Sequence, residues 1–344
     1  MTRTMKALVL EHFGDDLVLR DLERPQPQQG HVLVRVAASG VNPLDTKIRS
    51  GDAAHAGVEP PAVLGIDLAG TVVELGPGTQ GHFAIGDEVY GMTGGVGRHQ
   101  GSLAEYVAAD ADLLALKPSR LSMREAAALP LAAITAWEAL VDHGRVGPGM
   151  LVLVQGGAGG VGHVAVQLAL ARGAVVYATE VGAGLERVGA LGAEAIDGRR
   201  PIQQYVAANT GGSGFDLVLD TRGGATLDAS FEAVKEHTGH VVSILGWGRH
   251  SLAPLSMRGA TYSGVFTLLP LLTGRGRAHH GEILRAISEL VDAGAITPVL
   301  SRQTYDWRTA SAAHQAVAQG HTDGKVVVNL DEHSEAFDQE RPHG

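Results

Sequence analysis

The chain has no cysteine, and this absence narrows its chemistry before any motif is considered. Disulfide bonds, thiolate nucleophiles and cysteine-ligated zinc sites all require cysteine, so they are excluded. Aromatic residues make up only 4% of the chain, and its core must therefore consist mainly of Ala, Val and Leu. The 16 histidines are scattered along the chain. The adjacent pair His279-His280 would point apart on a helix, so we predict no metal site.

Basic clusters and long apolar runs are also missing. The formal net charge of −10 and the lack of a Lys/Arg block disfavour a nucleic-acid partner. No apolar run is long enough to cross a membrane, and the N-terminus lacks the apolar segment of a secretory signal. We therefore expect a cytoplasmic protein with neither a nucleic-acid nor a membrane partner. At 344 residues, the chain is long enough to form two domains.

What the sequence does contain is a pattern of strand, glycine turn and helix near its middle. An apolar run over 151–154 leads into Gly157, Gly159 and Gly162, which fit G-x-G-x-x-G, and an amphipathic helix pattern follows. Such glycines allow a tight turn, the approach of a diphosphate to the backbone, and close packing of helix on strand. A second apolar run ends at Glu180, at the usual distance for an acidic residue that binds ribose. The pattern predicts dinucleotide binding; the alternative is a glycine-rich turn in an unrelated α/β domain.

The first 125 residues contain many short strand candidates separated by turns rich in glycine and proline. In one of them, Val32, Val34 and Val36 alternate with Leu33 and Arg35, which is the period of a strand with one buried face. A series of short strands of this kind predicts a barrel-like β module.

After a capping-box signature at Ser122, the pattern changes to helices that alternate with continuous apolar strands. Such strands are typical of a parallel sheet covered on both faces, so we expect an α/β fold with a doubly wound parallel sheet of the Rossmann type. An amphipathic helix over 281–294 and a closing strand from Gly324 follow, and the polar residues 333–344 predict a mobile tail. The expected strands of the parallel sheet lie near 151–155, 174–179, 215–220, 240–245 and 261–266.

A set of short motifs occurs in register along the chain. They lie at 38–45, 64–70, 86–91, 101–106, 134–137, in the glycine turn, and at 324–328. Together they resemble the medium-chain dehydrogenase/reductase superfamily, and specifically its zinc-free branch of NADPH:quinone oxidoreductases and enone reductases. The resemblance implies a β-rich GroES-like catalytic domain over 1–126 and 268–332. It also implies a Rossmann dinucleotide-binding domain over 127–267.

The resemblance also bears on zinc. Zinc-dependent relatives have a Cys where this chain has Asn42 and a His where it has Ile66, so both ligands are missing. Without a Lewis acid, the acceptor must be one that needs less polarisation than a simple ketone. Quinones and α,β-unsaturated carbonyls meet this condition, because hydride addition delocalises charge onto a conjugated oxygen. We therefore expect transfer of hydride from NADPH to a quinone or to the β-carbon of an enone. The alternatives are a zinc-free alcohol dehydrogenase and a non-catalytic or redox-sensing dinucleotide-binding protein.

The catalytic candidates are Asn42, Asp45 and Lys47. By resemblance, Asn42 and Thr135 would orient the nicotinamide ring, although Asn42 could instead be a turn residue before Pro43 and Thr135 a helix-packing residue. Relatives often have a tyrosine where this chain has Lys47. A lysine there could stabilise a developing enolate or help to relay a proton, or it could be a solvated surface charge.

The sequence contains one signal for NADH and one for NADPH. Glu180 could accept a hydrogen bond from a ribose 2′-hydroxyl, which favours NADH, whereas Arg199 and Arg200 could bind a 2′-phosphate. Relatives commonly favour NADPH, so NADPH is the expectation and NADH the alternative. As in relatives, Val265 could also pair across a homodimer. The expected cofactor-binding residues are Asn42, Thr135, Gly157, Ala158, Gly159, Gly160, Val161, Thr179, Glu180, Arg199, Gly246, Val265, Phe266 and Lys325.

Overall fold

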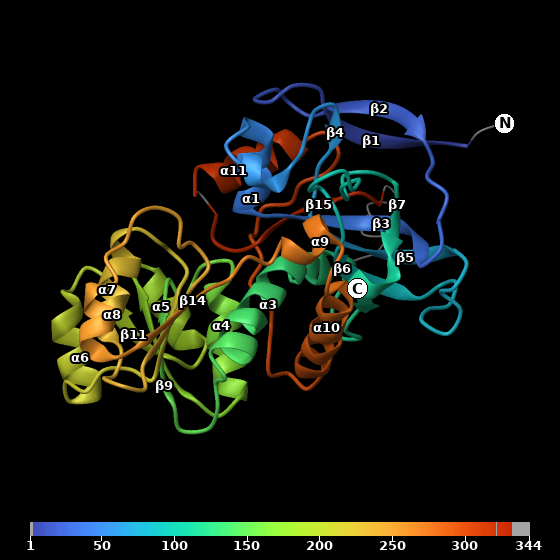
Figure 1. The fold of residues 1–344 in the computed structure, drawn as a ribbon. Helices are drawn as coiled ribbons and strands as arrows, with labels where there is room; N and C mark the ends of the chain where they lie inside the picture. The colour runs from blue at the N-terminus through green and yellow to red at the C-terminus, as the bar shows by residue number, and fades with distance from the viewer. Residues whose placement is uncertain (1–2, 321, 332–344) are drawn as a thin grey trace, which may run out of the picture. The chain divides into compact units, whose positions relative to one another are not determined.

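A computed structural model describes residues 3–320 and 322–331 of the chain. The segment 333–344, for which we predict a tail, lies outside the described residues. The chain divides into two compact units (Figure 1). The first contains the described parts of 1–131, 268–292 and 298–344, and the second contains 132–267 and 293–297.

The second unit is built on a six-stranded parallel sheet in the order β11-β10-β9-β12-β13-β14. The order reverses between β9 and β12, which is the doubly wound arrangement predicted from the sequence. In such sheets ligands bind beyond the carboxyl ends of the strands, next to this reversal. The strands are β9 (Leu151–Gln155), β10 (Val175–Glu180), β11 (Glu194–Asp197), β12 (Leu217–Asp220), β13 (His240–Ser243) and β14 (Thr261–Gly264).

Helices connect these strands. The central strand β9 is buried at Val152, Leu153 and Val154, which explains why its apolar run has no helical period. The strand β11 was not among the predicted strands. The helical segments are α3 (Pro130–Trp137), in which the boundary between the units falls, the π-helical turn η3 (Glu138–His143), α4 (Gly162–Ala171), α5 (Gly184–Ala190), α6 (Ile202–Thr210), α7 (Ala225–Ala233) and α8 (Ala253–Arg258).

The first unit is the β-rich module. Its larger sheet is antiparallel, in the order β15-β3-β5-β6-β8 with β7 also paired to β3, and a smaller sheet has the order β2-β1-β4. The predicted fold class is thereby confirmed. The strands are β1 (Thr4–Leu10), β2 (Val18–Glu23), β3 (His31–Val41), β4 (Ala62–Val63), β5 (Asp67–Leu75), β6 (Glu88–Met92), β7 (Tyr106–Asp110), β8 (Leu114–Leu116) and β15 (Val326–Asn329).

The long strand β3 differs from its predicted pattern. Leu33 is as fully buried as Val32 and Val34, and only Arg35 interrupts the buried run with an exposed side chain. Because consecutive side chains of a strand point to opposite faces, this burial shows that β3 is covered on both faces over residues 32–34.

The helices of the first unit follow local signals in the sequence. Ser122 and Glu125 form the predicted capping box at the start of α2, and α1 begins with a second capping box between Asn42 and Asp45. The helix α10 buries Ile283, Leu284, Ile287 and Val291, as its period predicts. The helical segments are α1 (Pro43–Ser50), η1 (Ala54–Ala56), η2 (Ala111–Leu113), α2 (Met123–Ala127), α9 (Leu269–Thr273), α10 (Arg277–Asp292) and α11 (Ala310–Ala318).

Candidate functional site

The glycine turn between β9 and α4 is packed as the sequence motif requires. A Cβ on Gly157 would lie 2.5 Å from the Cβ of Ala178, and one on Gly162 would lie 2.0 Å from the carbonyl oxygen of Gly156. These two positions therefore require glycine for close packing. Gly159 and Gly160 are exposed, and no side chain caps α4. Together with the adjacent Val161, this end of the helix is open to a diphosphate group.

Thr179, the next-to-last residue of β10, holds this turn in place. Its carbonyl oxygen accepts hydrogen bonds from the amides of Gly156 and Gly157, at 3.2 and 3.1 Å. Its hydroxyl accepts from the Gly156 amide at 3.2 Å and donates to the Gln155 side chain at 2.7 Å. These four hydrogen bonds join Thr179 to residues 155–157, so Thr179 holds the shape of the glycine turn.

Glu180 ends β10 and points toward the glycine turn rather than into solvent. Its carboxylate accepts from the amide of Ala158 at 3.2 Å and from that of Val181 at 3.3 Å. The guanidinium group of Arg222 donates to the same carboxylate at 2.9 Å. Since β10 and β12 flank β9 on its two sides, this ion pair spans the end of the central strand.

Sequence reasoning missed Arg222, which follows β12. The buried carboxylate of Asp220 accepts from the amides of Arg222 and Gly223, at 3.1 and 3.0 Å, and this fixes the loop. The hydroxyl of Thr221 donates to the Gln155 carbonyl oxygen at 2.6 Å. These contacts place Arg222 beside Gly156, where a Cβ would lie 3.0 Å from Nε of Arg222.

Arg199, which the sequence assigns to the cofactor, has a different partner. Its Nε donates to both carboxylate oxygens of Asp197, at 2.9 and 3.1 Å, and its side chain is 71% exposed. The hydrogen bonds from Arg199 lower the pKa of Asp197 to about 2. The ion pair of Arg199 with Asp197 is thus separate from that of Arg222 with Glu180.

Of the residues expected near the nicotinamide, Thr135 and Val265 lie in the second unit. The buried hydroxyls of Thr135 and Thr267 lie 3.1 Å apart, and Thr267 donates to Glu138 at 2.6 Å. These hydrogen bonds connect α3 and the π-helical turn η3 to Thr267, which follows β14. The amide of Val265 donates to the Ser243 carbonyl at 2.9 Å.

The loop after β13 contains Gly246, where a Cβ would lie 2.2 Å from the hydroxyl oxygen of Tyr262. Trp247, which follows it, is 57% exposed and packs edge-to-face on Phe266, with ring centroids 5.9 Å apart. The Tyr262 side chain from β14 would therefore have to move aside to admit any larger residue at 246.

In the first unit, four buried polar residues form one cluster, which we call the Asn42 cluster: Asn42, Asp45, Asp67 and Lys325. The ammonium group of Lys325 donates to Oδ1 of Asn42, and Nδ2 of Asn42 donates to Asp67 at 2.9 Å. The backbone amide of Asn42 donates to the Asp45 carboxylate at 2.8 Å, which forms part of the capping box of α1. The sequence placed Asn42, Asp45 and Lys325 in the site separately, and the structure brings them together with Asp67.

The cluster places two carboxyl groups and one ammonium group away from water. Burial raises the pKa of Asp45 to about 7 and that of Asp67 to about 6, while the charge of Lys325 opposes both shifts. Burial lowers the pKa of Lys325, and the two carboxylates oppose that shift. Oδ1 of Asp45 is buried without a hydrogen-bond partner among the described residues. Asp45 can therefore carry a proton near neutral pH.

This donor set does not suit zinc. The oxygen of Asn42 is occupied by an ammonium group, and Ile66, at the second expected ligand position, is a fully buried apolar side chain. Within the part of the chain that the structure describes, no group of three or more His, Asp or Glu side chains could hold a metal ion. Lys47, the third catalytic candidate, is exposed on α1, and its catalytic role stays a prediction.

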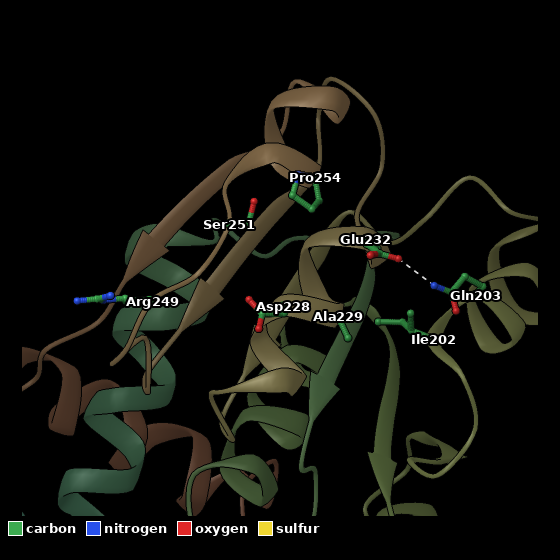
Figure 2. A pocket seen from close by; sticks show the side chains of 8 residues that line it. All are labelled: Ile202, Gln203, Asp228, Ala229, Glu232, Arg249, Ser251 and Pro254. Atoms are coloured by element: carbon green, nitrogen blue, oxygen red, sulfur yellow. Dashed lines mark hydrogen bonds between the residues drawn. The ribbon is translucent and has the colours of Figure 1, made fainter.

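One open pocket of about 370 Å³ lies elsewhere in the second unit, between α6, α7 and the segment leading into α8 (Figure 2). Gln203 and Glu232 on its wall are hydrogen-bonded at 2.9 Å. None of the predicted site residues lines it, and its polar side chains are exposed, so we assign it no function. Across residues 3–320 and 322–331, no helix combines the length and apolarity needed to span a membrane.

Comparisons with known proteins agree with this architecture. The family of the alcohol dehydrogenase GroES-like domain matches residues 28–119, and that of the zinc-binding dehydrogenases matches residues 191–328. The chain is 33% identical over 338 residues to the 2-methylene-furan-3-one reductase of Solanum lycopersicum, covering 94% of this chain and 79% of the relative. It is 32% identical over 337 residues to the chloroplastic NADPH-dependent alkenal/one oxidoreductase of Arabidopsis thaliana, covering 95% of this chain and 80% of the relative.

Solved structures share the whole fold. A crystal structure of an alcohol dehydrogenase superfamily protein from Novosphingobium aromaticivorans is 54% identical, with a TM-score of 0.93, and covers 95% of this chain and 100% of that one. The quinone oxidoreductase from Coxiella burnetii is 30% identical, with a TM-score of 0.80, and covers 96% of this chain and 100% of its own. These matches show that the chain belongs to the medium-chain dehydrogenase/reductase superfamily of oxidoreductases.

Proposed function

We propose that this protein is a zinc-independent reductase that transfers hydride from NADPH to a quinone or to the β-carbon of an α,β-unsaturated carbonyl. The observation that carries the proposal is the Asn42 cluster. At the position where zinc-dependent relatives have a ligand, Asn42 is bonded to a buried ammonium group and a buried carboxyl group. An acceptor that delocalises its own charge suits such a site. The alkenal/one oxidoreductase and 2-methylene-furan-3-one reductase names of two relatives support the same substrate class.

The second unit would hold the cofactor. Gly159, Gly160 and the start of α4 would bind the diphosphate, and Glu180 with Arg222 would face the adenosine ribose. When bound, the reduced nicotinamide supplies the hydride. The NADPH-dependent relative from Arabidopsis thaliana supports NADPH, and so does the compensation of the Glu180 charge by Arg222.

The first unit would supply groups that polarise and protonate the acceptor. Lys325 and Asp67 fix the amide of Asn42 in one orientation, which leaves the second Nδ2–H group of Asn42 to donate to a carbonyl oxygen. A preoriented donor of this kind stabilises the negative charge that develops on an enolate oxygen. Asp45 carries a buried carboxyl group whose pKa of about 7 lets it hold the proton that must follow the hydride.

The test is oxidation of NADPH and NADH by the purified protein against a panel of quinones, 2-alkenals, enones and simple ketones, with and without chelator. We expect the absorbance of NADPH to fall with quinones or enones, without any effect of chelator. Turnover of alcohol/ketone pairs alone would instead identify an alcohol dehydrogenase. Tight NADPH binding without turnover of any acceptor would identify a binding or redox-sensing protein, and chelator-sensitive turnover would contradict zinc independence.

We also propose that two copies associate through β14. This strand ends the sheet order, and among the described strands it pairs with β13 alone. Tyr262 on β14 is exposed, as are Trp247 and Met257 nearby in the sequence. Light scattering should give the mass of two chains, and Tyr262→Glu, which would bring like charges together, should give the mass of one. A single-chain mass for the unchanged protein would refute the proposal.

We propose a cytoplasmic location for the protein, on the basis of its composition. Fractionation of the source cells tests this proposal. Recovery of the protein in a membrane or organelle fraction would contradict it.

A further inference from the structure

The ion pair between Glu180 and Arg222 lies where the adenosine ribose of a dinucleotide would bind, at the ends of β10 and β12. We propose that Arg222 is a specificity-determining residue for the cofactor, and that its guanidinium group pairs with the 2′-phosphate of NADPH. The inference rests on the proposed function and goes beyond it, because it assigns recognition of the phosphate to one side chain.

The Glu180 carboxylate already has hydrogen-bond partners within the protein, which makes it a poor ligand for ribose hydroxyls. A free carboxylate at the end of this strand binds the ribose hydroxyls of NADH and repels a 2′-phosphate. Here one oxygen of Glu180 accepts from the amide of Ala158, and the other accepts from Arg222 and Val181. The carboxylate is 9% exposed, three of its about four acceptor sites are occupied within the protein, and Arg222 compensates its charge.

The guanidinium group of Arg222, in contrast, is half-exposed and can reach a ligand. A guanidinium group has five N–H donors, and among the described residues only Nη2 of Arg222 is engaged, with Glu180. The side chain is 48% exposed, and its backbone is fixed by the buried carboxylate of Asp220. The group therefore presents further donors beside the glycine turn at little entropic cost. Two parallel N–H groups match the geometry of a phosphate.

Arg199 is less suited to the same task. Both oxygens of Asp197 accept from its Nε, and Nη2 donates to one of them as well. To bind a phosphate through this edge, Arg199 would have to leave a bidentate partner two residues away. Arg222 would keep its contact with Glu180 and bind the phosphate through its remaining donors.

The experiment compares two ligands that differ only in the 2′-phosphate, namely adenosine 2′,5′-bisphosphate and AMP, by titration calorimetry on the full chain. Arg222→Gln should weaken binding of the bisphosphate by about tenfold or more and leave AMP binding nearly unchanged. Arg222→Lys keeps the charge but loses the planar fork, so it should weaken binding by a smaller factor. Glu180→Gln should preserve or strengthen binding of the bisphosphate.

Arg302→Gln is the matched control, because Arg302 forms an exposed ion pair with Asp323 in the first unit. It removes the same net charge and should leave both affinities unchanged. Melting temperatures measured for each variant separate a loss of folding from a loss of binding. The ratio of NADPH to NADH turnover should fall with Arg222→Gln by the same factor as the ratio of the two affinities.

The outcomes separate the inference from the proposed function. Binding of AMP without preference for the bisphosphate, in a protein that turns over enones with NADH, would refute the role of Arg222 and leave enone reduction in place with NADH as the cofactor. An unchanged ratio in Arg222→Gln, or a fall in the ratio with Arg199→Gln instead, would refute it as well. If the unchanged protein bound neither nucleotide and oxidised neither cofactor, both proposals would fail.

Discussion

Replacing Lys325 by Met removes the positive charge from the Asn42 cluster while keeping a side chain of similar length. Asp45 and Asp67 would then remain buried without a cation, and Oδ1 of Asn42 would lose its donor. Removing one partner of a buried ion pair typically costs about 3–5 kcal/mol, because the remaining charge is left uncompensated. We expect a loss of stability of this size at about pH 8.

The loss should depend on pH in a definite direction. The folded-state pKa values of Asp45 and Asp67, about 7 and about 6, lie above the ordinary value of 3.8. Such groups bind protons in the folded state that they have lost in the unfolded state, so stability falls as pH rises from about 4 to about 7. Without Lys325 both pKa values rise further. The penalty is therefore largest above about pH 7 and small at about pH 5, where both carboxyl groups are protonated with or without the lysine.

The assay is urea unfolding of the full chain at about pH 5 and pH 8, followed by circular dichroism. Lys117→Met is the matched control, because Lys117 is also buried but pairs with Glu88, whose side chain is 55% exposed. Its effect should be similar at both pH values. If Lys325→Met destabilised the chain equally at both, the charges of the cluster would not be coupled as described.

Three further predictions concern single side chains. Asp45→Asn keeps the acceptor for the Asn42 amide but cannot ionise, so it should be more stable than the unchanged protein by up to about 4 kcal/mol at pH 8 and equal at pH 4, in urea titrations. Gly162→Ala should lower both stability and NADPH affinity, because its Cβ would meet a carbonyl oxygen at 2.0 Å, whereas Gly159→Ala should fold normally and lose affinity alone; equal melting temperatures for the two would contradict this. Tyr90→Phe removes the hydrogen bond from the buried Tyr90 hydroxyl to the Leu284 carbonyl and should cost about 1 kcal/mol, measured by thermal unfolding.

Local patterns in the sequence were sufficient to predict the elements around the cofactor site. The apolar run of β9, the glycines after it and the capping box at Ser122 each report on neighbours within a few residues, and all three occur in the structure. The strand β11 escaped prediction because it has only four residues, two of them acidic, at the edge of the sheet. A short edge strand carries too little apolar pattern to be distinguished from a loop.

The contacts between distant residues could not be predicted. Glu180 and Arg222 are 42 positions apart, and no motif links an arginine after β12 to an acid at the end of β10. Asn42 and Lys325 are 283 positions apart, so their pairing depends on β15 lying beside β3. The sequence indicated both residues as site candidates on the strength of the resemblance. Only the register of two antiparallel strands turns them into one charge cluster.

The pairing of β15 with the end of β3 sets the order in which the protein can mature during synthesis. Asp45 and Asp67 leave the ribosome well before Lys325, the buried lysine whose charge opposes theirs. The nascent β-rich unit therefore carries both acids without their buried cation until Lys325 is added, and by then every residue of the second unit has been made. A chain that stops before Lys325 would contain every residue of the second unit but an unfinished β-rich unit.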